Sequence, residues 1–290
     1  MTTDHTQDIL HPFIFDNSAV RGNCVHLDLS LQNALEHQSL PPALKQVIGE
    51  FTAASVLLTS TLKMEGKLIL QLQSQGALQL LVVECTSQLD IRTTAKVQGE
   101  LHGQHLTDWL QQGQLVITLM PENGEPYQGI VPLEGDSIAT MLENYMLRSQ
   151  QIDTRLWLFA ENDQAAGLLL QKLPQQTEQD LDCWNRVQHL AGTVTAQELL
   201  HLDTATLLQR LFAEEDVRLF AGRDIRAFCS CSPENVANML KMLGIAEVSS
   251  ILDEQGSVQI QCDFCNKHYL IDEQEAMALF TDDDDHPLTH

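Results

Sequence analysis

Two closely spaced cysteine pairs near the C-terminus are the feature that most constrains this chain. Cys229 and Cys231 form a C-x-C pair, and Cys262 and Cys265 form a C-x-x-C pair. A compact fold can bring the four sulfurs of two such pairs to one tetrahedral Zn²⁺. The spacing therefore predicts a four-cysteine zinc site, and the alternative is a disulfide scaffold or a set of unconnected thiols.

The residues around the pairs predict a small zinc module. Ser232-Pro233-Glu234 supplies a capping hydroxyl, a proline at the first helical position and an acid in the first turn. Gly244 falls where a left-handed C-terminal cap is expected, and a second turn or helix is predicted over residues 246–252. Alternating strands place the second pair at the tip of a hairpin, where Asn266 can adopt a left-handed backbone. Asp272 begins an Asp-x-x-Glu capping pattern for a last helix.

Upstream, strand patterns alternate with helical ones, as expected of an α+β domain. An early strand is predicted over residues 19–28, and a long helix begins at Pro41-Pro42 with an apolar stripe that continues to Leu62. Further β segments are predicted over residues 68–73, 78–84, 115–119, 127–133, 155–159 and 167–173, with a helix over about residues 136–148. These patterns predict an α/β-type N-terminal domain, residues 1–174, with a mixed sheet and a long helix.

The pattern changes to helices alone over residues 175–220. Leu181, Trp184 and Val187 recur at intervals of three, and a capping-box pattern begins at Thr195. Helices this short are marginal alone and depend on what covers their apolar faces. The segment is therefore either an ordinary helical subdomain or a linker whose folding depends on its neighbours.

The strongly acidic composition argues against a nucleic-acid partner. The chain carries 40 Asp and Glu against 16 Lys and Arg, a formal net charge of −24. The predicted zinc-binding domain, residues 221–290, is acidic as well. Nucleic-acid binders instead gain affinity from Lys and Arg side chains that neutralise phosphates. No apolar run approaches the ~18 residues that a membrane span needs. We expect a soluble protein without nucleic-acid or membrane partners, and the lack of a signal-peptide pattern near the start places it in a reducing cytoplasm.

Several other features have ordinary interpretations. Cys24, Cys85 and Cys183 lie in apolar contexts and are expected to be buried small hydrophobes. His268 could replace a sulfur ligand, but four cysteines already fill a tetrahedral site. The acidic run Asp282–Asp285 is expected to be a solvated terminus rather than a cation site. The sequence has no Walker loop, G-x-S-x-G or H-E-x-x-H motif, so it does not indicate an enzyme of phosphate or hydrolytic chemistry.

Beyond the cysteine pairs, longer stretches match one known family. They are the run from Cys265 to Tyr269, Val20-Arg21-Gly22, the run from Leu58 to Lys63, Tyr127-Gln128-Gly129-Ile130-Val131, the run from Leu133 to Asp136, and the run from Ala165 to Gln171. With these stretches the whole chain resembles the bacterial redox-regulated chaperones called heat shock protein 33, or the 33 kDa chaperonin family. Asn266 stands where the family commonly has glycine, and Pro233 and Asn235 stand where it often has basic residues.

The resemblance implies a function and a mechanism. Chaperones of this family are holdases without ATP use and not enzymes. They are inactive when reduced and zinc-bound, and disulfide formation with zinc release activates them to bind unfolding client proteins under oxidative and heat stress. For this chain the resemblance implies one Zn²⁺ per chain in the reduced form, held by Cys229, Cys231, Cys262 and Cys265. Residues 175–220 would be the responsive linker, and a homodimer is a candidate assembly of the oxidised form.

The close spacing within each pair suggests the oxidation products, Cys229 with Cys231 and Cys262 with Cys265. A C-x-C disulfide closes a tight ring and should be easily reduced again. Two other classes stay open. One is a thiol-disulfide oxidoreductase that uses Cys262 and Cys265, which needs a free C-x-x-C of low pKa. The other is a zinc-ribbon module that contacts nucleic acid or RNA polymerase.

Overall fold

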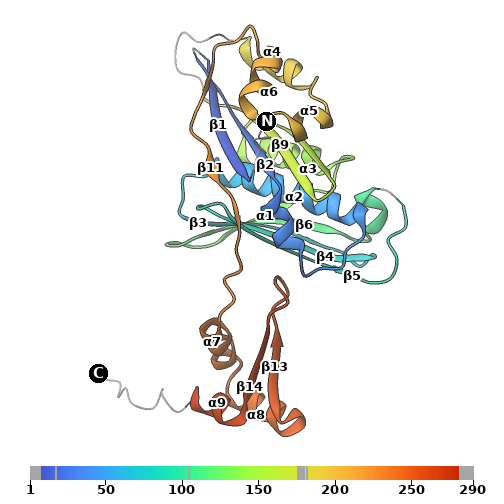
Figure 1. Cartoon of the computed structure of the whole chain (residues 1–290), viewed down its shortest axis with the longest axis vertical. Helices are drawn as coiled ribbons and strands as arrows, with labels where there is room; N and C mark the ends of the chain where they lie inside the picture. The colour runs from blue at the N-terminus through green and yellow to red at the C-terminus, as the bar shows by residue number, and fades with distance from the viewer. Residues whose placement is uncertain (1–7, 17, 104, 175–179, 181, 281–290) are drawn as a thin grey trace, which may run out of the picture. The chain divides into compact units, whose positions relative to one another are not determined.

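The chain divides into two compact units, Met1–Phe228 and Cys229–His290 (Figure 1). The computed structural model describes residues 8–16, 18–103, 105–174, 180 and 182–280. The first unit holds the α/β segment, the helical segment and residues 221–228, and the second holds the two cysteine pairs. The predicted three-part division at residues 174 and 220 rests on changes in the sequence pattern, and it stays a prediction.

One sheet of the first unit is antiparallel and joins strands from both ends of its sequence. Its order is β10-β1-β2-β9-β8, and β11 also pairs with β1. The strands are β1 Ile9–Phe15, β2 Val20–Leu27, β8 Thr154–Glu161, β9 Gln164–Lys172, β10 Val217–Leu219 and β11 Arg223–Asp224. The sequence did not predict β1, because Pro12 lies inside it and a proline argues against a strand with neighbours on both sides.

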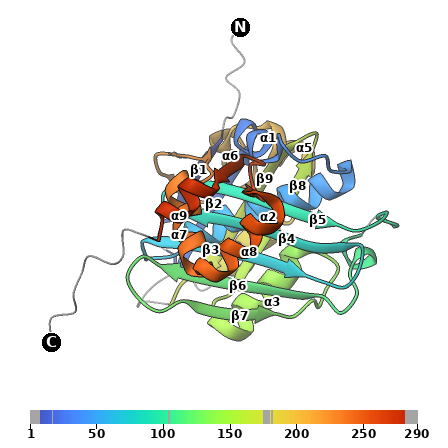
Figure 2. The ribbon, with the colours of Figure 1, turned by 90° about the horizontal axis from the view of Figure 1, so that it is seen from below.

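The other sheet of the first unit is mixed, but only through a strand that lies outside residues 1–174, for which a mixed sheet was predicted. Its order is β12-β5-β4-β3-β6-β7, and β12 pairs with β5 in parallel while the other pairs are antiparallel. Figure 2 shows β5, β4, β3, β6 and β7 side by side. The strands are β3 Gly66–Gln73, β4 Leu78–Thr86, β5 Asp90–Val97, β6 Gln114–Pro121, β7 Tyr127–Val131 and β12 Arg226–Ala227, with a short 3-10 turn, η1, at Leu106–Trp109. The sequence did not predict β5, because Thr93 and Thr94 occupy two of its buried positions and weaken the apolar alternation.

The predicted long helix, α2, is Pro42–Thr59 and packs between the two sheets. Leu44, Ile48 and Phe51 on it are fully buried. The helix ends three residues before Leu62, where the sequence pattern had placed its end. The hydroxyls of Ser60 and Thr61 donate to carbonyls in the last turn and close it, which the apolar stripe alone does not reveal. Two further helices belong to this layer, α1 Leu29–Leu35 and α3 Ile138–Gln150.

The helical segment covers the outer face of the antiparallel sheet (Figure 1). Its helices are α4 Cys183–Ala191, α5 Ala196–His201 and α6 Thr204–Leu211. Thr195 caps α5 with the predicted capping box, whereas Leu181 lies outside the described residues. A second apolar core joins this layer to the sheet through the buried side chains of Phe13, Phe15, Val20, Cys24, Ala166, Leu168, Leu170, Cys183, Trp184, Val187, Ala191, Val194, Leu199, Leu200, Leu207, Leu208, Leu211 and Phe212.

The second unit is a small α+β module. Its elements are α7 Pro233–Leu243, α8 Ile245–Gln255, β13 Ser257–Gln261, β14 His268–Asp272 and α9 Glu273–Ala278. Gly244 has a positive φ of 88° but a ψ of 155°, so it is not the predicted left-handed cap. Because α8 begins at the next residue, Gly244 is an extended junction between two helices. Across the described residues of the chain, no helix combines the length and the apolar character that crossing a bilayer requires.

One buried histidine connects the helical layer to the sheet beneath it. His26 on β2 is 3% exposed, and its Nε2 donates to the carbonyl of Leu199 on α5 at 2.9 Å. Its Nδ1 has no hydrogen-bond partner among the described groups. Burial lowers the pKa of His26, and nearby His11 lowers it further, while the Leu199 carbonyl and Asp203 act in the opposite direction. The imidazole is therefore neutral in the folded protein at neutral pH.

We expect acidification to destabilise the first unit through His26. Its folded-state pKa lies below the ordinary value of 6.5, so the unfolded chain binds the proton more tightly and stability falls as the pH drops below that value. His26→Gln keeps an amide donor for the Leu199 carbonyl but cannot titrate. Denaturant unfolding between about pH 7.5 and pH 5 should show a flatter pH dependence for this variant than for wild type. His201→Gln, at an exposed position on α5, is the matched control, and equal slopes for wild type and His26→Gln would refute the expectation.

Candidate metal centre

The four paired cysteines lie together in the second unit. All four Sγ atoms lie within 4.8 Å of one another. The Sγ–Sγ distance is 3.6 Å between Cys229 and Cys262 and 3.3 Å between Cys231 and Cys265. One pair precedes α7 and the other lies on the turn between β13 and β14. The fold thus brings together the four cysteines that the sequence predicted as ligands, although the two pairs lie more than thirty residues apart in the sequence.

The second pair is held by a tight turn at the tip of the hairpin. The amide of Cys262 donates to the Lys267 carbonyl at 3.0 Å, and the amide of Asn266 donates back to the Cys262 carbonyl at 2.9 Å. Asn266 adopts the predicted left-handed conformation, with a φ of 54°. Asparagine tolerates this region better than other residues with a side chain, so the turn forms without glycine.

The first pair is held by the start of α7. Pro233 occupies the first turn of α7, and the Ser232 hydroxyl accepts from the amide of Asn235 at 3.1 Å, as predicted. The side-chain amide of Asn235 donates to the carbonyl of Ser230, between the two cysteines, at 2.6 Å. Asn235 thus fixes the C-x-C loop against the helix, a role that the sequence pattern did not indicate.

The spacing of the sulfurs fits a tetrahedral ion. Zinc–sulfur bonds of about 2.3 Å in tetrahedral geometry place the sulfurs roughly 3.8 Å apart. The Sγ–Sγ separations of 3.3 Å and 3.6 Å lie close to that value, and no pair of the four sulfurs is more than 4.8 Å apart. All four cysteines are partly buried, which limits exchange with solvent while leaving the sulfurs within reach of small reagents. The donor set therefore fits zinc.

The surroundings shift the pKa of three of the four thiols. Burial raises the pKa of Cys229 to about 12 and also raises that of Cys265. Burial acts in the same direction on Cys231, but the nearby Tyr269 hydroxyl and the other three sulfurs outweigh it and lower the pKa to about 7. A divalent cation is the partner that would hold all four sulfurs as thiolates at neutral pH.

Tyr269 is a component of the site that sequence reasoning assigned only to a strand. Its side chain is 9% exposed, and its hydroxyl makes no well-aligned hydrogen bond to any described group although it lies beside the sulfurs. Lys267 lies over its ring, with Nζ 5.2 Å from the centroid. The alternation of β14 predicts that the Tyr269 side chain is buried. Only the folded hairpin of β13 and β14 shows that it is buried beside the cysteines.

The other candidate residues lie outside the cluster. His268 is exposed and is not part of the group of possible metal ligands found among the described residues. Cys24, Cys85 and Cys183 are buried as predicted, and burial raises the pKa of Cys24 and Cys85 to about 12. Thiols with so high a pKa are poor nucleophiles and poor ligands. The acidic run Asp282–Asp285 lies outside the described residues.

The fold and the cysteine cluster can be compared with known proteins. Residues 8–272 match the model of a family described as Hsp33 protein. The chain belongs to the Hsp33 family. It is 54% identical over 277 residues to the 33 kDa chaperonin of Methylobacillus flagellatus, with 94% of each chain covered. It is 48% identical over 283 residues to the 33 kDa chaperonin of Chromobacterium violaceum, covering 97% of this chain and 96% of that one.

A solved structure supports the assignment at the level of the fold. The crystal structure of the 33 kDa chaperonin from Thermotoga maritima matches with a TM-score of 0.78 at 21% identity, covering 94% of this chain and 97% of that one. The predicted α+β fold and the resemblance to this family are confirmed. The names of the relatives describe a chaperone, which is a non-enzymatic role, so the oxidoreductase alternative is not favoured.

Removing one sulfur of the cluster should remove the metal. Cys262→Ser leaves three thiolate ligands, and we expect reduced protein purified with zinc to lose its bound equivalent. Because a structural zinc contributes about 10–16 kcal/mol to the folding of a small module, amide protection in the second unit should collapse as well. Metal analysis and hydrogen exchange measure both effects. Cys183→Ser, which removes a thiol outside the cluster, should keep the zinc, and full zinc content in Cys262→Ser would contradict the assignment.

Proposed function

We propose that this chain is a redox-regulated, ATP-independent holdase whose reduced, zinc-bound form is inactive. The observation that carries the proposal is the cluster of four sulfurs that closes the second unit. It joins the start of this unit, at Cys229 and Cys231, to the tip of its hairpin, at Cys262 and Cys265. Oxidation of these sulfurs would therefore act on the stability of the whole unit.

The second unit has little else to hold it together. Among the described residues, its apolar core cluster consists of Leu240, Val248, Leu252, Val258 and Ala276, and Val236 and Tyr269 are the other buried apolar side chains. Modules of this size seldom reach stability from the core alone and use metals or disulfides instead. A bound zinc would supply a cross-link between the two pairs and keep the sulfurs deprotonated. Loss of the thiolate ligands should then unfold the unit.

Peroxide chemistry can remove those ligands in two steps. One thiolate attacks the O–O bond of hydrogen peroxide, becomes a sulfenic acid and releases hydroxide. The neighbouring thiolate then attacks the sulfenic sulfur, forms the S–S bond and releases a second hydroxide, so one disulfide consumes one peroxide. We propose the pairs Cys229–Cys231 and Cys262–Cys265 from their spacing in the sequence. All four sulfurs are within reach of one another, so their mutual distances do not distinguish this pairing from others.

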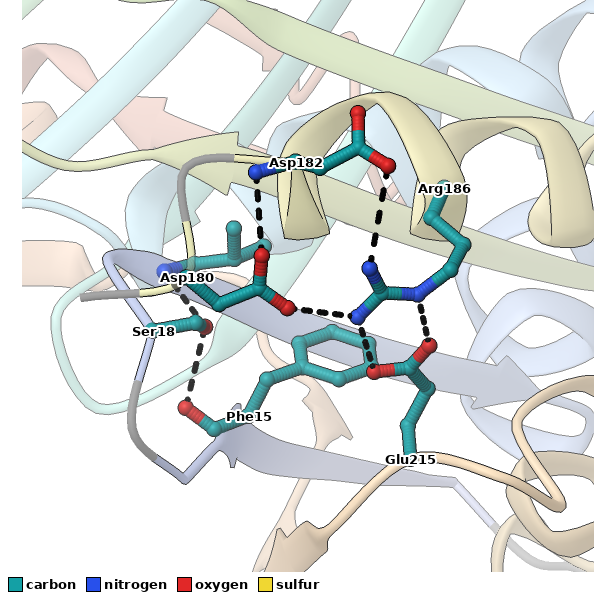
Figure 3. A network of polar contacts seen from close by, with 7 residues as sticks. Phe15, Ser18, Asp180, Asp182, Arg186 and Glu215 are labelled. Carbon is teal, nitrogen blue, oxygen red and sulfur yellow. Dashed lines mark hydrogen bonds and ion pairs between the residues drawn. The ribbon is translucent and has the colours of Figure 1, made fainter.

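One arginine links the two ends of the helical segment to each other (Figure 3). Arg186 on α4 donates through Nε and Nη2 to both carboxylate oxygens of Glu215, at 2.5 Å and 2.9 Å. Its Nη2 also donates to Asp180 at 2.8 Å, ahead of the helix. Glu215 lies between α6 and β10, and its side chain is only 10% exposed. A bidentate pair of this kind is stronger than a single charged contact, so the segment is held as one body.

Chain continuity connects this segment to the metal centre. After α6 the chain forms β10, β11 and β12 in succession, and Cys229 follows the end of β12 by two residues. These strands are short, and Arg226 on β12 holds Asp90 from an exposed position. We propose that unfolding of the second unit frees this stretch and then the helices before it, which makes residues 175–220 the responsive linker.

Undocking of the helices would expose an apolar sheet face. The side chains of Phe13 and Phe15 on β1 and of Leu168 and Leu170 on β9 are buried beneath the helical layer. Each large apolar side chain contributes about 1.5–3 kcal/mol when buried, so a bare face would bind exposed apolar segments of unfolding proteins. We propose this face as the client-binding surface. While the helices cover it, the protein is inactive.

We also propose that the protein works in the cytoplasm. Paired thiols stay reduced in the cytoplasm until an oxidant appears, which suits a switch of this kind. A net charge of −24 would keep the protein in solution when apolar surface becomes exposed, and it disfavours a zinc-ribbon role on nucleic acid. We also propose that the oxidised form makes a homodimer, because the exposed apolar face of one chain can pair with the same face of a second chain.

Oxidation should convert the protein from an inactive to an active holdase. We expect peroxide at heat-shock temperature to release the zinc, and light scattering should then show that the protein suppresses aggregation of a thermally unfolding client. Reduction with zinc should reverse both effects. Turnover in an insulin-reduction assay would favour the oxidoreductase, and salt-dependent binding of DNA or RNA would favour the zinc ribbon. Equal holdase activity before and after oxidation would sink the proposal.

Weakening the arginine network should make activation easier. Arg186→Gln removes the charge that holds both Glu215 and Asp180, and we expect the variant to suppress aggregation at a lower peroxide dose than wild type. Arg210→Gln is the matched control, because Arg210 pairs at 3.4 Å with Glu198 inside the same helical layer. If the two variants and wild type share one dose response, the network does not hold the linker closed.

A further inference from the structure

Arg21 on β2 stands apart from the other arginines of this acidic chain. The sequence has nine arginines, and seven of them pair with a carboxylate in the described part of the chain, namely Arg92, Arg148, Arg155, Arg186, Arg210, Arg218 and Arg226. Of the two without such a pair, Arg223 is exposed, whereas Arg21 is partly buried. Burial lowers the pKa of Arg21, and no neighbouring acid acts against this effect.

The guanidinium of Arg21 is held in place by uncharged groups. Its Nε and Nη2 donate to the side-chain oxygen of Gln171 at 3.0 Å and 2.7 Å, and Nη2 reaches the Thr61 carbonyl at 3.5 Å. Gln171 is fully buried, and its own amide donates to Thr154 at 3.1 Å, so its oxygen is fixed toward the arginine. Among the described residues, Nη1 makes no hydrogen bond. The charge is oriented but not neutralised.

Arg21 lines a cavity of about 110 Å³ whose other walls are mostly apolar. These walls come from the end of α2, from β3 and β6, and from α3. The apolar side chains include Leu58, Leu62, Leu68, Ile117, Leu119 and Met146. Tyr145 and Gln150 add polar atoms, and the amide of Gln150 donates to the Tyr145 hydroxyl at 3.3 Å. One cation with a few polar groups in an apolar pocket is the usual composition of a small-ligand site.

The wall that carries Tyr145 needs a glycine on the neighbouring strand. A Cβ on Gly129 of β7 would lie 2.2 Å from the Tyr145 oxygen, so any larger residue would displace the ring. Arg21, Thr61, Gly129 and Gln171 all fall in sequence runs that carry the family resemblance but lie far in the sequence from the four paired cysteines. Arg21 and Thr61 line the cavity, whereas Gln171 and Gly129 lie against its lining residues Arg21 and Tyr145. Neither the metal centre nor the helical linker accounts for this arrangement.

A purely structural role explains this arrangement less well. Arg21 does connect β2 to β9 through Gln171, but an amide oxygen does not offset a full positive charge, and a partly buried cation without a counter-charge is costly. The chain has 40 acidic residues from which a partner could have come. A carboxylate that enters with a ligand would supply the missing charge and could pair with the guanidinium in the bidentate geometry that arginine favours.

We propose that this cavity binds a small monocarboxylate with a short apolar body. The carboxylate lies on Arg21, and the apolar body packs among Leu58, Leu119 and Met146. A dry cavity of about 150 Å³ accommodates benzene, so a space of this size suits a body of about five carbons. The site belongs to the first unit and does not depend on the proposed redox switch, so either can fail without the other.

Hexanoate is a suitable probe, titrated into the full-length, reduced, zinc-loaded protein by calorimetry. We expect saturable binding that is about 10- to 100-fold tighter than that of hexanol, because a charge-assisted hydrogen bond replaces a neutral one. Methyl resonances of Met146 and Leu119 should shift on binding. Absence of binding, equal affinities for hexanoate and hexanol, or shifts confined to other methyl groups would each overturn the proposal.

Variants test the role of the charge. Arg21→Gln should lower the affinity for hexanoate by about 10- to 100-fold while leaving that for hexanol unchanged. Arg148 is on α3, the helix that carries Tyr145, and its exposed charge pairs with Glu134. The control variant Arg148→Gln should therefore bind hexanoate as wild type does. Hexanoate affinity retained in Arg21→Gln would overturn the assignment. If Arg21→Gln fails to fold, the comparison of hexanoate with hexanol on wild type still decides.

Discussion

The mutual approach of four sulfurs is the constraint on which the second unit depends. This unit buries few apolar side chains, so the C-x-C loop before α7 and the hairpin tip stay together only if something joins them at the cysteines. Without a cation, burial raises the pKa of Cys229 and Cys265, so these partly buried sulfurs resist the thiolate form. In the proposed switch, a bound cation would hold the four sulfurs as thiolates and join the two pairs, and oxidation of the sulfurs would remove this link.

The first unit has the opposite character, because its stability is distributed. Helix α2 is buried between two sheets, and this core does not involve the paired cysteines. The outer helical layer lies between these extremes. It covers apolar side chains of β1 and β9, yet its helices are short. The bonds of Arg186 join parts of this layer to one another, whereas His26 joins the sheet to α5. In the proposed mechanism this layer would detach while the sheet beneath it stays intact, as regions of low local stability do.

Much of the local structure follows from the sequence because its causes are local. The caps at Ser232, Asp272 and Thr195 and the left-handed turn at Asn266 all depend on residues a few positions apart. Strands β1 and β5 were missed for the converse reason. Their patterns are interrupted by a proline or by buried threonines, and only their partner strands make them strands. Gly244 was misassigned because the adjacent helix begins without a turn between them.

The cysteine spacing by itself determined that four sulfurs could meet, and the longer runs determined the family. Tertiary structure alone decided what those sulfurs neighbour and what else the chain brings together. Arg21 meets Gln171 across 150 positions of sequence, and His26 meets Leu199 across 173. No periodicity or motif encodes such pairs, because each depends on how separate sheets and helices stack. Spacing rules relate residues that are near one another in the sequence. Burial and the lack of a charged partner depend on residues that meet only in the folded structure.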